Sequence, residues 1–466
     1  MVKLNLNESF ICRIWEESSY YSNLKTTLDK EIEIVDYGTK NTDSGPDYYN
    51  CRVKIGGILY SGCAEIHRSE SDWHEHKHSK DNKYNEVILH IVFYKDDFSG
   101  DSLNPKAKKS RQIPTVILSE FLTKSIHEIW KEIINNPSPR FRLPCFPKNH
   151  EIATSVKTNW LSKLSKDRLN DKSLKIKNRL EEISDDLSKK IYWENVLFEY
   201  ICEALGYSKN KNQFLNLAQK TDIDKIKKLN LNRIQTDSLL FGLSGFLIDL
   251  RYRDKYIDDL KSSWNNLNDI IRKEIADKSE WNFFRLRPAN FPTVRIAYAS
   301  GILFEILYND FFKGIVKIFE ESSDLTNDLI ILFKKVEISE YWKRNYNFGK
   351  ESKNETAKIG EDRIKDIITN VLLPLINLYA EKFSKTPLKN RVDFLYRKEK
   401  QKSGSNEITR IMEKQLDVKV KTISDEQALI QLHNLYCLKG KCNDCEIGKV
   451  VFSAKRVQEP LKIILY

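Results

Sequence analysis

The sequence predicts an α+β protein with an N-terminal mixed-sheet domain, a large all-helical domain and a small cysteine-rich tail. Three observations support this prediction. The 466 residues exceed one ordinary core, so two or three domains are expected. Residues 51–94 contain the alternating and continuous apolar runs that are typical of strands. From about residue 152 onward, apolar residues recur three and four positions apart, which is typical of helices.

The N-terminal domain is predicted to begin with a helix at residues 7–20 and a strand at residues 31–37. Residues 51–55 alternate between apolar and polar types, and two glycines at 56–57 then provide a hairpin turn. Residues 87–94 form a nearly continuous apolar run, which indicates a strand covered on both faces.

The other elements follow from the same patterns. In chain order we expect an edge strand at 113–118, a helix at 119–134, a proline-bearing boundary at 136–148, helices at 165–187, 192–205, 237–246, 255–275 and 362–383, an exposed loop at 344–358 and a basic linker at 397–406. The predicted domains are therefore residues 1–148, 149–420 and 421–466.

The predicted hairpin brings acidic and basic side chains together. On its return strand Glu65 and His67 share one face, and Asp47 stands in a Gly-Pro-Asp turn near the start of the partner strand. Alternatively, Asp47 caps backbone amides in the turn, and Glu65 and His67 lie on a strand face that is exposed to solvent.

An acidic residue before one strand, followed by Glu-x-basic on the next, resembles the PD-(D/E)xK nuclease superfamily. The resemblance implies a restriction-endonuclease-like fold, Mg²⁺ or another divalent cation on Asp47 and Glu65, and a water-handling role for His67. The superfamily usually has lysine where His67 stands. Such nucleases often take an accessory carboxylate from the first helix, which makes Glu8 and Glu17 candidates.

Histidines are concentrated around the hairpin, and His90 within the apolar run is expected to be a core residue. Gly45-Pro46-Asp47 followed by Asp-Trp-His-Glu-His at 72–76 also resembles very-short-patch mismatch-repair endonucleases, which have histidines after the hairpin. The accessory candidates here are Asp72, His74, His76 and His78. They are interpreted as transition-metal ligands, phosphate contacts or a polar loop, and the loop is the default.

Segments along nearly the whole chain also resemble a bacterial family known only as domain of unknown function 2851. The matching segments are GPDYYN, EIH-x₄-DW-x₂-H-x-H, LRPANFPTVRIA at 286–297 and YC-x₄-C-x₂-C-x-IG near the end. The resemblance implies no particular activity.

Three arginines are candidates for phosphate binding. Arg285, Arg287 and Arg295 flank the point where a helix is predicted to begin, around Thr293, and a helix N-terminus favours an anion. The alternative is that these arginines pair with acidic residues of the helical domain.

The tail carries a second candidate metal site. His433, Cys437, Cys442 and Cys445 would together complete a tetrahedral structural zinc site. Alternatively, a distant cysteine such as Cys145 supplies the fourth thiolate of an iron–sulfur cluster. The third interpretation is that the thiols are free.

Composition favours an anionic partner in a reducing compartment. The net charge of +11 favours nucleic acid, and no apolar run approaches a membrane span. The first residues lack a signal-peptide pattern, so we expect a cytoplasmic protein with reduced thiols. The sequence leaves the oligomeric state open.

The leading functional hypothesis is a divalent-metal-dependent nuclease acting on DNA or RNA. The first rival is a non-catalytic nucleic-acid-binding protein with the same fold. The second is a metal-dependent hydrolase of small molecules that uses the histidine cluster as its metal site.

Overall fold

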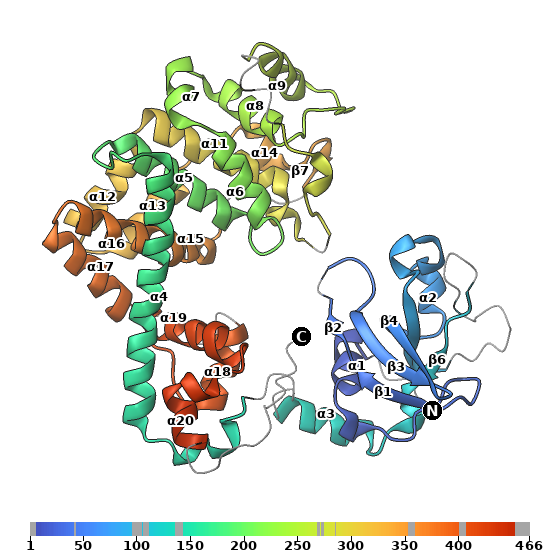
Figure 1. The fold of residues 1–466 in the computed structure, drawn as a ribbon. Coiled ribbons are helices and arrows are strands. Elements are labelled where there is room, and N and C mark those ends of the chain that lie inside the picture. Colours follow the sequence, from blue (N-terminus) through green and yellow to red (C-terminus); the bar gives the residue numbers. More distant parts are fainter. Residues whose placement is uncertain are drawn as a thin grey trace. The chain divides into compact units, whose positions relative to one another are not determined.

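The computed structural model describes residues 6–41, 43–95, 105, 111–135, 143–267, 271, 275–284, 286–352, 359–399 and 407–452. The chain forms two compact units. The first comprises residues 1–152, 414–417 and 435–466, and the second comprises residues 153–413 and 418–434. The first contains a mixed sheet and the second is largely helical, so the predicted α+β class is confirmed (Figure 1).

The sheet of the first unit is mixed. Its strands are β1 (Ile32–Asp36), β2 (Thr39–Lys40), β3 (Tyr48–Ile55), β4 (Ile58–Ser69), β5 (Val87–Tyr94) and β6 (Thr115–Ile117). The order is β1-β3-β4-β5-β6, with β2 paired to β3. Strands β1, β3 and β4 are antiparallel, whereas β4, β5 and β6 run parallel.

The β3–β4 hairpin forms where it was predicted. Ile55 pairs with Ile58, so Gly56 and Gly57 are the two turn residues. Both have positive φ, 58° and 82°, which glycine adopts without the steric cost of a Cβ. The predicted strand at 87–94 is also present as β5, and it is buried along its length except at the half-buried Tyr94.

Helices and turns around the sheet are shorter than predicted. Helix α1 (Glu8–Trp15) begins after Asn7, whose side chain accepts a hydrogen bond from the Phe10 amide. It ends before residue 20 because Glu17 is extended and begins a separate 3₁₀ turn, η1 (Ser18–Tyr20). Likewise, a 3₁₀ turn, η5 (Leu118–Phe121), precedes α3 (Ile126–Asn135).

Beyond residue 153 the chain is dominated by helices around a separate hydrophobic core. They are α4 (Thr154–Ile183), α5 (Lys190–Leu205), α6 (Lys211–Lys220), α7 (Ile223–Leu229), α8 (Arg233–Leu243), α9 (Lys255–Asn265), α11 (Pro292–Tyr308), α12 (Phe311–Glu321), α13 (Leu325–Lys334), α14 (Glu340–Arg344), α15 (Glu361–Ile367), α16 (Leu373–Lys382), α17 (Thr386–Lys398), α18 (Glu407–Leu416) and α19 (Ile423–Leu432).

Some boundaries differ from the predictions for local reasons. Helix α11 begins at Pro292 with Phe291 as its N-cap, because proline is favoured in a first turn, and the Thr293 hydroxyl donates to Tyr346 O instead. The expected loop at 344–358 contains a small hairpin of β7 (Asn345–Asn347) and β8 (Lys350–Glu351). Residues 400–406 of the predicted linker lie outside the described residues.

Residues 421–434, predicted as part of the tail, belong to the helical unit, since α19 packs against α4. Arg168 on α4 donates to Gln427 and Gln431 on α19, which fixes this contact. In the part of the chain that the structure describes, no helix combines the length and the apolar character needed to cross a bilayer.

Replacing Gly62 by alanine should destabilise the sheet. A Cβ there would lie 2.4 Å from Glu86 O, the carbonyl that accepts the Cys63 amide at 2.8 Å. We expect a loss of about 1–3 kcal/mol in the free energy of unfolding, measured in urea. Gly360→Ala is the control, because no atom lies within 4 Å of its added Cβ. Equal stability of the two variants would contradict the close approach.

Candidate metal centre

The segment that follows β4 is anchored at the end of that strand. It contains α2 (Asp72–Glu75), η2 (His78–Lys80) and η3 (Asn82–Tyr84). Asp72 Oδ2 accepts the Ser69 amide at 3.0 Å, and the buried Trp73 donates through Nε1 to Ser79 Oγ at 3.1 Å. Asp72, an accessory candidate, therefore holds the turn rather than joining the histidines.

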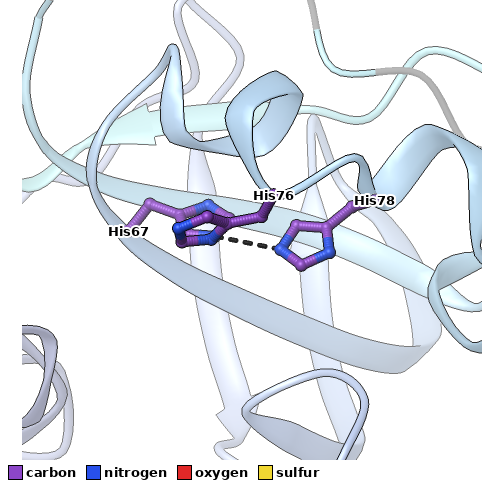
Figure 2. Close-up of side chains that lie close together, drawn as sticks. All are labelled: His67, His76 and His78. Carbon is purple, nitrogen blue, oxygen red and sulfur yellow. Dashed lines mark hydrogen bonds between the residues drawn. The ribbon is translucent and has the colours of Figure 1, made fainter.

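A left-handed residue directs two histidines toward the strand. Lys77 has φ of 60°, a conformation that costs a non-glycine residue about 1–2 kcal/mol. It separates His76, the C-cap of α2, from His78, the first residue of η2. Both imidazoles reach His67 on β4, as Figure 2 shows.

The three histidines form a compact group of potential ligands. His67 Nε2 lies 3.2 Å from both His76 Nδ1 and His78 Nε2, and one ligand atom of each lies within 4.8 Å of the others (Figure 2). Glu65 Oε1 lies 3.4 Å from both His67 Nε2 and His78 Nε2. A tetrahedral zinc ion with Zn–N bonds of about 2.0–2.1 Å separates its ligands by roughly 3.3–3.4 Å. The three histidines could therefore hold one transition-metal ion.

His90 fixes the orientation of His67. As predicted it is a core residue, 0% exposed, and its Nε2 lies 2.8 Å from His67 Nδ1. When His67 Nε2 offers its lone pair to an ion, its Nδ1 carries the proton and donates it to His90. His90 Nδ1 then faces Thr115 Oγ1 at 3.5 Å. Metal-binding histidines commonly have such a partner on the other ring nitrogen.

Burial keeps the imidazoles of His67, His78 and His90 neutral. Desolvation, followed by the neighbouring histidines, lowers the pKa of His67 far below its ordinary range. The same causes lower the pKa of His78 to about 4 and that of His90 to about 3. Their lone pairs are therefore available at neutral pH without proton release.

The aromatic surroundings reinforce this burial. The Tyr84 ring stacks on His78 with centroids 3.8 Å apart, and Trp73 meets the rings of His67, His78 and His90 edge-on. These aromatic residues were not among the predicted site residues. Trp73 and Tyr84 stand close to the histidines in the sequence, and this neighbourhood could have identified them as site residues.

The predicted carboxylates lie at the same end of the hairpin. The Asp47 amide donates to Glu65 Oε2 at 2.9 Å, and Asp47 Oδ2 accepts the Ile66 amide at 3.0 Å. Glu65 thus directs one oxygen at Asp47 and the other at the imidazoles.

The first helix contributes a carboxylate that the sequence reasoning missed. Glu16 is buried, accepts the Tyr48 hydroxyl at 2.7 Å and lies 3.5 Å from Lys40 Nζ. It follows Cys12 by four residues, so both lie on the inner face of that turn. Burial and then the charge of Asp47 raise the pKa of Cys12 to about 12, so this face is near the hairpin end.

The accessory candidates Glu8 and Glu17 are not part of the histidine group. Glu17 Oε1 accepts hydrogen bonds from the Ser19 amide and hydroxyl, and the half-buried Glu8 lies in the first turn of α1. His74 is exposed on α2 and is not part of the histidine group.

The predicted phosphate-binding arginines differ in their surroundings. Arg285 lies outside the described residues, and Arg287 is exposed at the N-cap of η9 (Pro288–Asn290). Arg295 is only 3% exposed; its Nη2 donates to Asn290 Oδ1 at 2.9 Å and its guanidinium faces Tyr207. Arg295 therefore lies inside the helical core.

The fold and the site together define an α+β protein with a buried histidine and carboxylate centre at the end of a β-hairpin. The chain belongs to the family described as Protein of unknown function (DUF2851), whose profile matches residues 8–404. No curated protein and no solved structure matches the chain. The cysteine tail lies beyond the matched region.

The metal-free protein should lose stability as the pH falls from about 6.5 toward 4. His78 and His90 have folded-state pKa values below the ordinary 6.5, so the unfolded chain binds protons first. As the pH falls through this window, each of the two histidines lowers the free energy of unfolding by up to about 1.4 kcal/mol per pH unit. Above the window neither has an effect. Urea unfolding of chelator-treated protein at several pH values measures this slope.

Replacing His78 by glutamine should reduce that slope, whereas His150→Gln, at a side chain that is 78% exposed, should leave it unchanged. An identical slope in wild type and His78→Gln would show that the buried imidazole does not titrate as expected.

Proposed function

We propose that this protein is a divalent-metal-dependent phosphodiesterase, a nuclease, whose ion is bound by His67, His76 and His78. The observation that supports it is the spacing of three imidazole nitrogens beside the Glu65 carboxylate. Imidazoles favour zinc and similar transition metals, whereas Mg²⁺ prefers oxygen ligands. The proposal therefore replaces Mg²⁺ with a transition metal, zinc being the best fit.

The exposure of one side of the histidine group favours a catalytic role over a structural one. His76 is exposed, although His67 and His78 are buried, so a substrate has access to the ion from the side of His76. A bound ion would make a water molecule acidic and polarise a phosphoryl oxygen. Glu65 Oε1, at 3.4 Å from two of the ligand nitrogens, would accept the proton from that water.

An anionic substrate is favoured by charge around the centre. Lys77, Lys80 and Lys83 are exposed on the same segment that supplies His76 and His78. The chain carries a net charge of +11. These lysines would attract the negatively charged backbone of a nucleic acid toward the ion.

His67→Ala should abolish metal-dependent cleavage, because it removes the ligand that touches both other histidines. We expect a decrease of at least about 100-fold in the cleavage of labelled DNA and RNA and of a simple aryl phosphodiester, with zinc or Mn²⁺ supplied. Metal content, measured by elemental analysis, should fall in parallel. His127→Ala, an exposed histidine on α3, is the matched control.

Glu65→Gln separates proton transfer from metal binding. The amide keeps the shape of the carboxylate but is not a base, so metal content should persist while cleavage falls. Loss of the metal would contradict the proton-accepting role and make Glu65 a ligand. Full activity in His67→Ala would contradict the nuclease proposal, and metal binding without any cleavage would support a non-catalytic binding protein.

Nucleic-acid binding is also supported by a basic pocket in the helical unit. It has a volume of about 550 Å³, and its cationic lining residues are Arg168, Lys172, Lys175, Lys211 and Arg363. Two carboxylates compensate part of this charge: Glu203 lies 2.9 Å from Lys175 and 3.3 Å from Lys211, and Asp366 lies 3.4 Å from Arg363. Burial, then the charges of Arg168 and Lys211, hold the pKa of Lys172 well below its usual value. A phosphate there would relieve this repulsion.

Lys172→Ala should weaken nucleic-acid binding and reduce its salt dependence. If Lys172 contacts a phosphate, the slope of log K against log salt should fall by roughly one unit. Fluorescence anisotropy with a labelled oligonucleotide measures both quantities. The control is Lys228→Ala, whose side chain is 72% exposed and paired with Asp224 at 2.7 Å. An unchanged slope in Lys172→Ala would exclude this pocket from the binding surface.

A further inference from the structure

Four of the eight cysteines come from two distant parts of the sequence and meet in the first unit. Cys145 precedes η7 (Phe146–Glu151), whereas Cys442 begins η12 (Cys442–Asp444) and Cys445 precedes α20 (Glu446–Phe452). Helix α20 packs against both η7 and η12. These contacts bring the two cysteine-bearing segments together although almost the entire helical unit separates them in sequence.

The thiols themselves are close enough to interact. Burial raises the pKa of Cys437 well above its usual value, and the charges of Cys145, Cys445 and Cys442 raise it further, in that order. The pKa of Cys442 is raised by burial and by Cys445. In the absence of a cation, these thiols resist becoming thiolates because their charges repel one another.

Local geometry holds the tail in this arrangement. The Cys445 amide donates to Cys442 O, and the Lys441 amide donates to Tyr436 O, which closes the turn between the thiols. Gly448 lies directly on this turn, since a Cβ there would be 2.0 Å from Cys442 O. Glycine at this position allows α20 to approach the cysteine loop closely.

The cysteine sulfurs are too far apart for one zinc ion. A tetrahedral zinc site with Zn–S bonds of about 2.3 Å separates its sulfurs by roughly 3.8 Å. The described residues include all eight cysteines, yet no three of the cysteine sulfurs lie within 4.8 Å of one another there. Four thiols with wider spacing, one buried and three half-buried, fit a metal cluster that is larger than a single ion.

We propose that Cys145, Cys437, Cys442 and Cys445 bind a [4Fe–4S] cluster. Each thiol loses its proton and ligates one iron, and the positive iron–sulfide core offsets the four thiolate charges. The cluster would link the segment around Cys145, which follows the sheet in the sequence, to the cysteine tail. His433 is not among the proposed ligands; its Nδ1 contacts Asn434 Oδ1 at 3.0 Å.

Anaerobic purification of the full chain tests this proposal through iron and acid-labile sulfide. We expect about four of each per chain, together with the visible absorption of thiolate-bound iron. Sulfide distinguishes the cluster from any metal on the histidines, so the result is independent of the proposed nuclease centre. The absence of iron and sulfide, with the four thiols either freely alkylated or protected from alkylation by zinc, would overturn the cluster.

Variants identify the ligands. Cys145→Ser and Cys442→Ser should each lose most of the iron and sulfide, whereas His433→Ala should keep both. Cys51→Ser is the matched control, because a serine hydroxyl can replace the thiol that donates to Tyr37 O at 3.0 Å. A Cys145→Ser protein with a full complement of iron and sulfide would exclude Cys145 as the fourth ligand.

Discussion

The parallel pairing of β4 with β5 is the interaction on which the candidate metal centre depends. Its register places Glu65 opposite His90 and His67 opposite Val92. This alignment puts His90 within hydrogen-bond distance of His67 in the sheet interior. A slip of one residue would turn Glu65 and His67 to the other face, because side chains alternate along a strand. The pairing of β4 with the buried strand β5 therefore determines which side chains meet at the site, as well as the fold.

The histidine group brings several ring nitrogens and a carboxylate close together. Once His67 Nδ1 has donated to His90, its Nε2 lone pair faces two imidazole nitrogens and a carboxylate oxygen at 3.2–3.4 Å. Protonation would relieve this crowding, but burial opposes charge on His67. The surrounding structure also maintains Lys77 in a left-handed conformation. Strain and crowding at one point are typical of functional sites, and a divalent ion would relieve the electrostatic part.

Local signals made the hairpin predictable, and tertiary contacts decided the rest. The two turn glycines and the alternation before them identify the hairpin and, with it, the shared edge of Asp47 and Glu65. The convergence of His76 and His78 was left open because it depends on a left-handed Lys77, for which lysine gives no signal. Cys145 was named as a partner of the tail, but only the packing of α20 against η7 brings the two together.

Burial explains why histidine stands at position 67. The side chain is 1% exposed and has three imidazoles as neighbours. A lysine there would carry an ammonium into a desolvated site beside other nitrogens, whereas neutral imidazole can be buried at much lower cost. In the proposed nuclease, histidine in place of a lysine would add a metal ligand and remove a fixed positive charge. Under that proposal the histidine would favour zinc-like ions over Mg²⁺, and the exposed lysines of the following segment would attract the substrate.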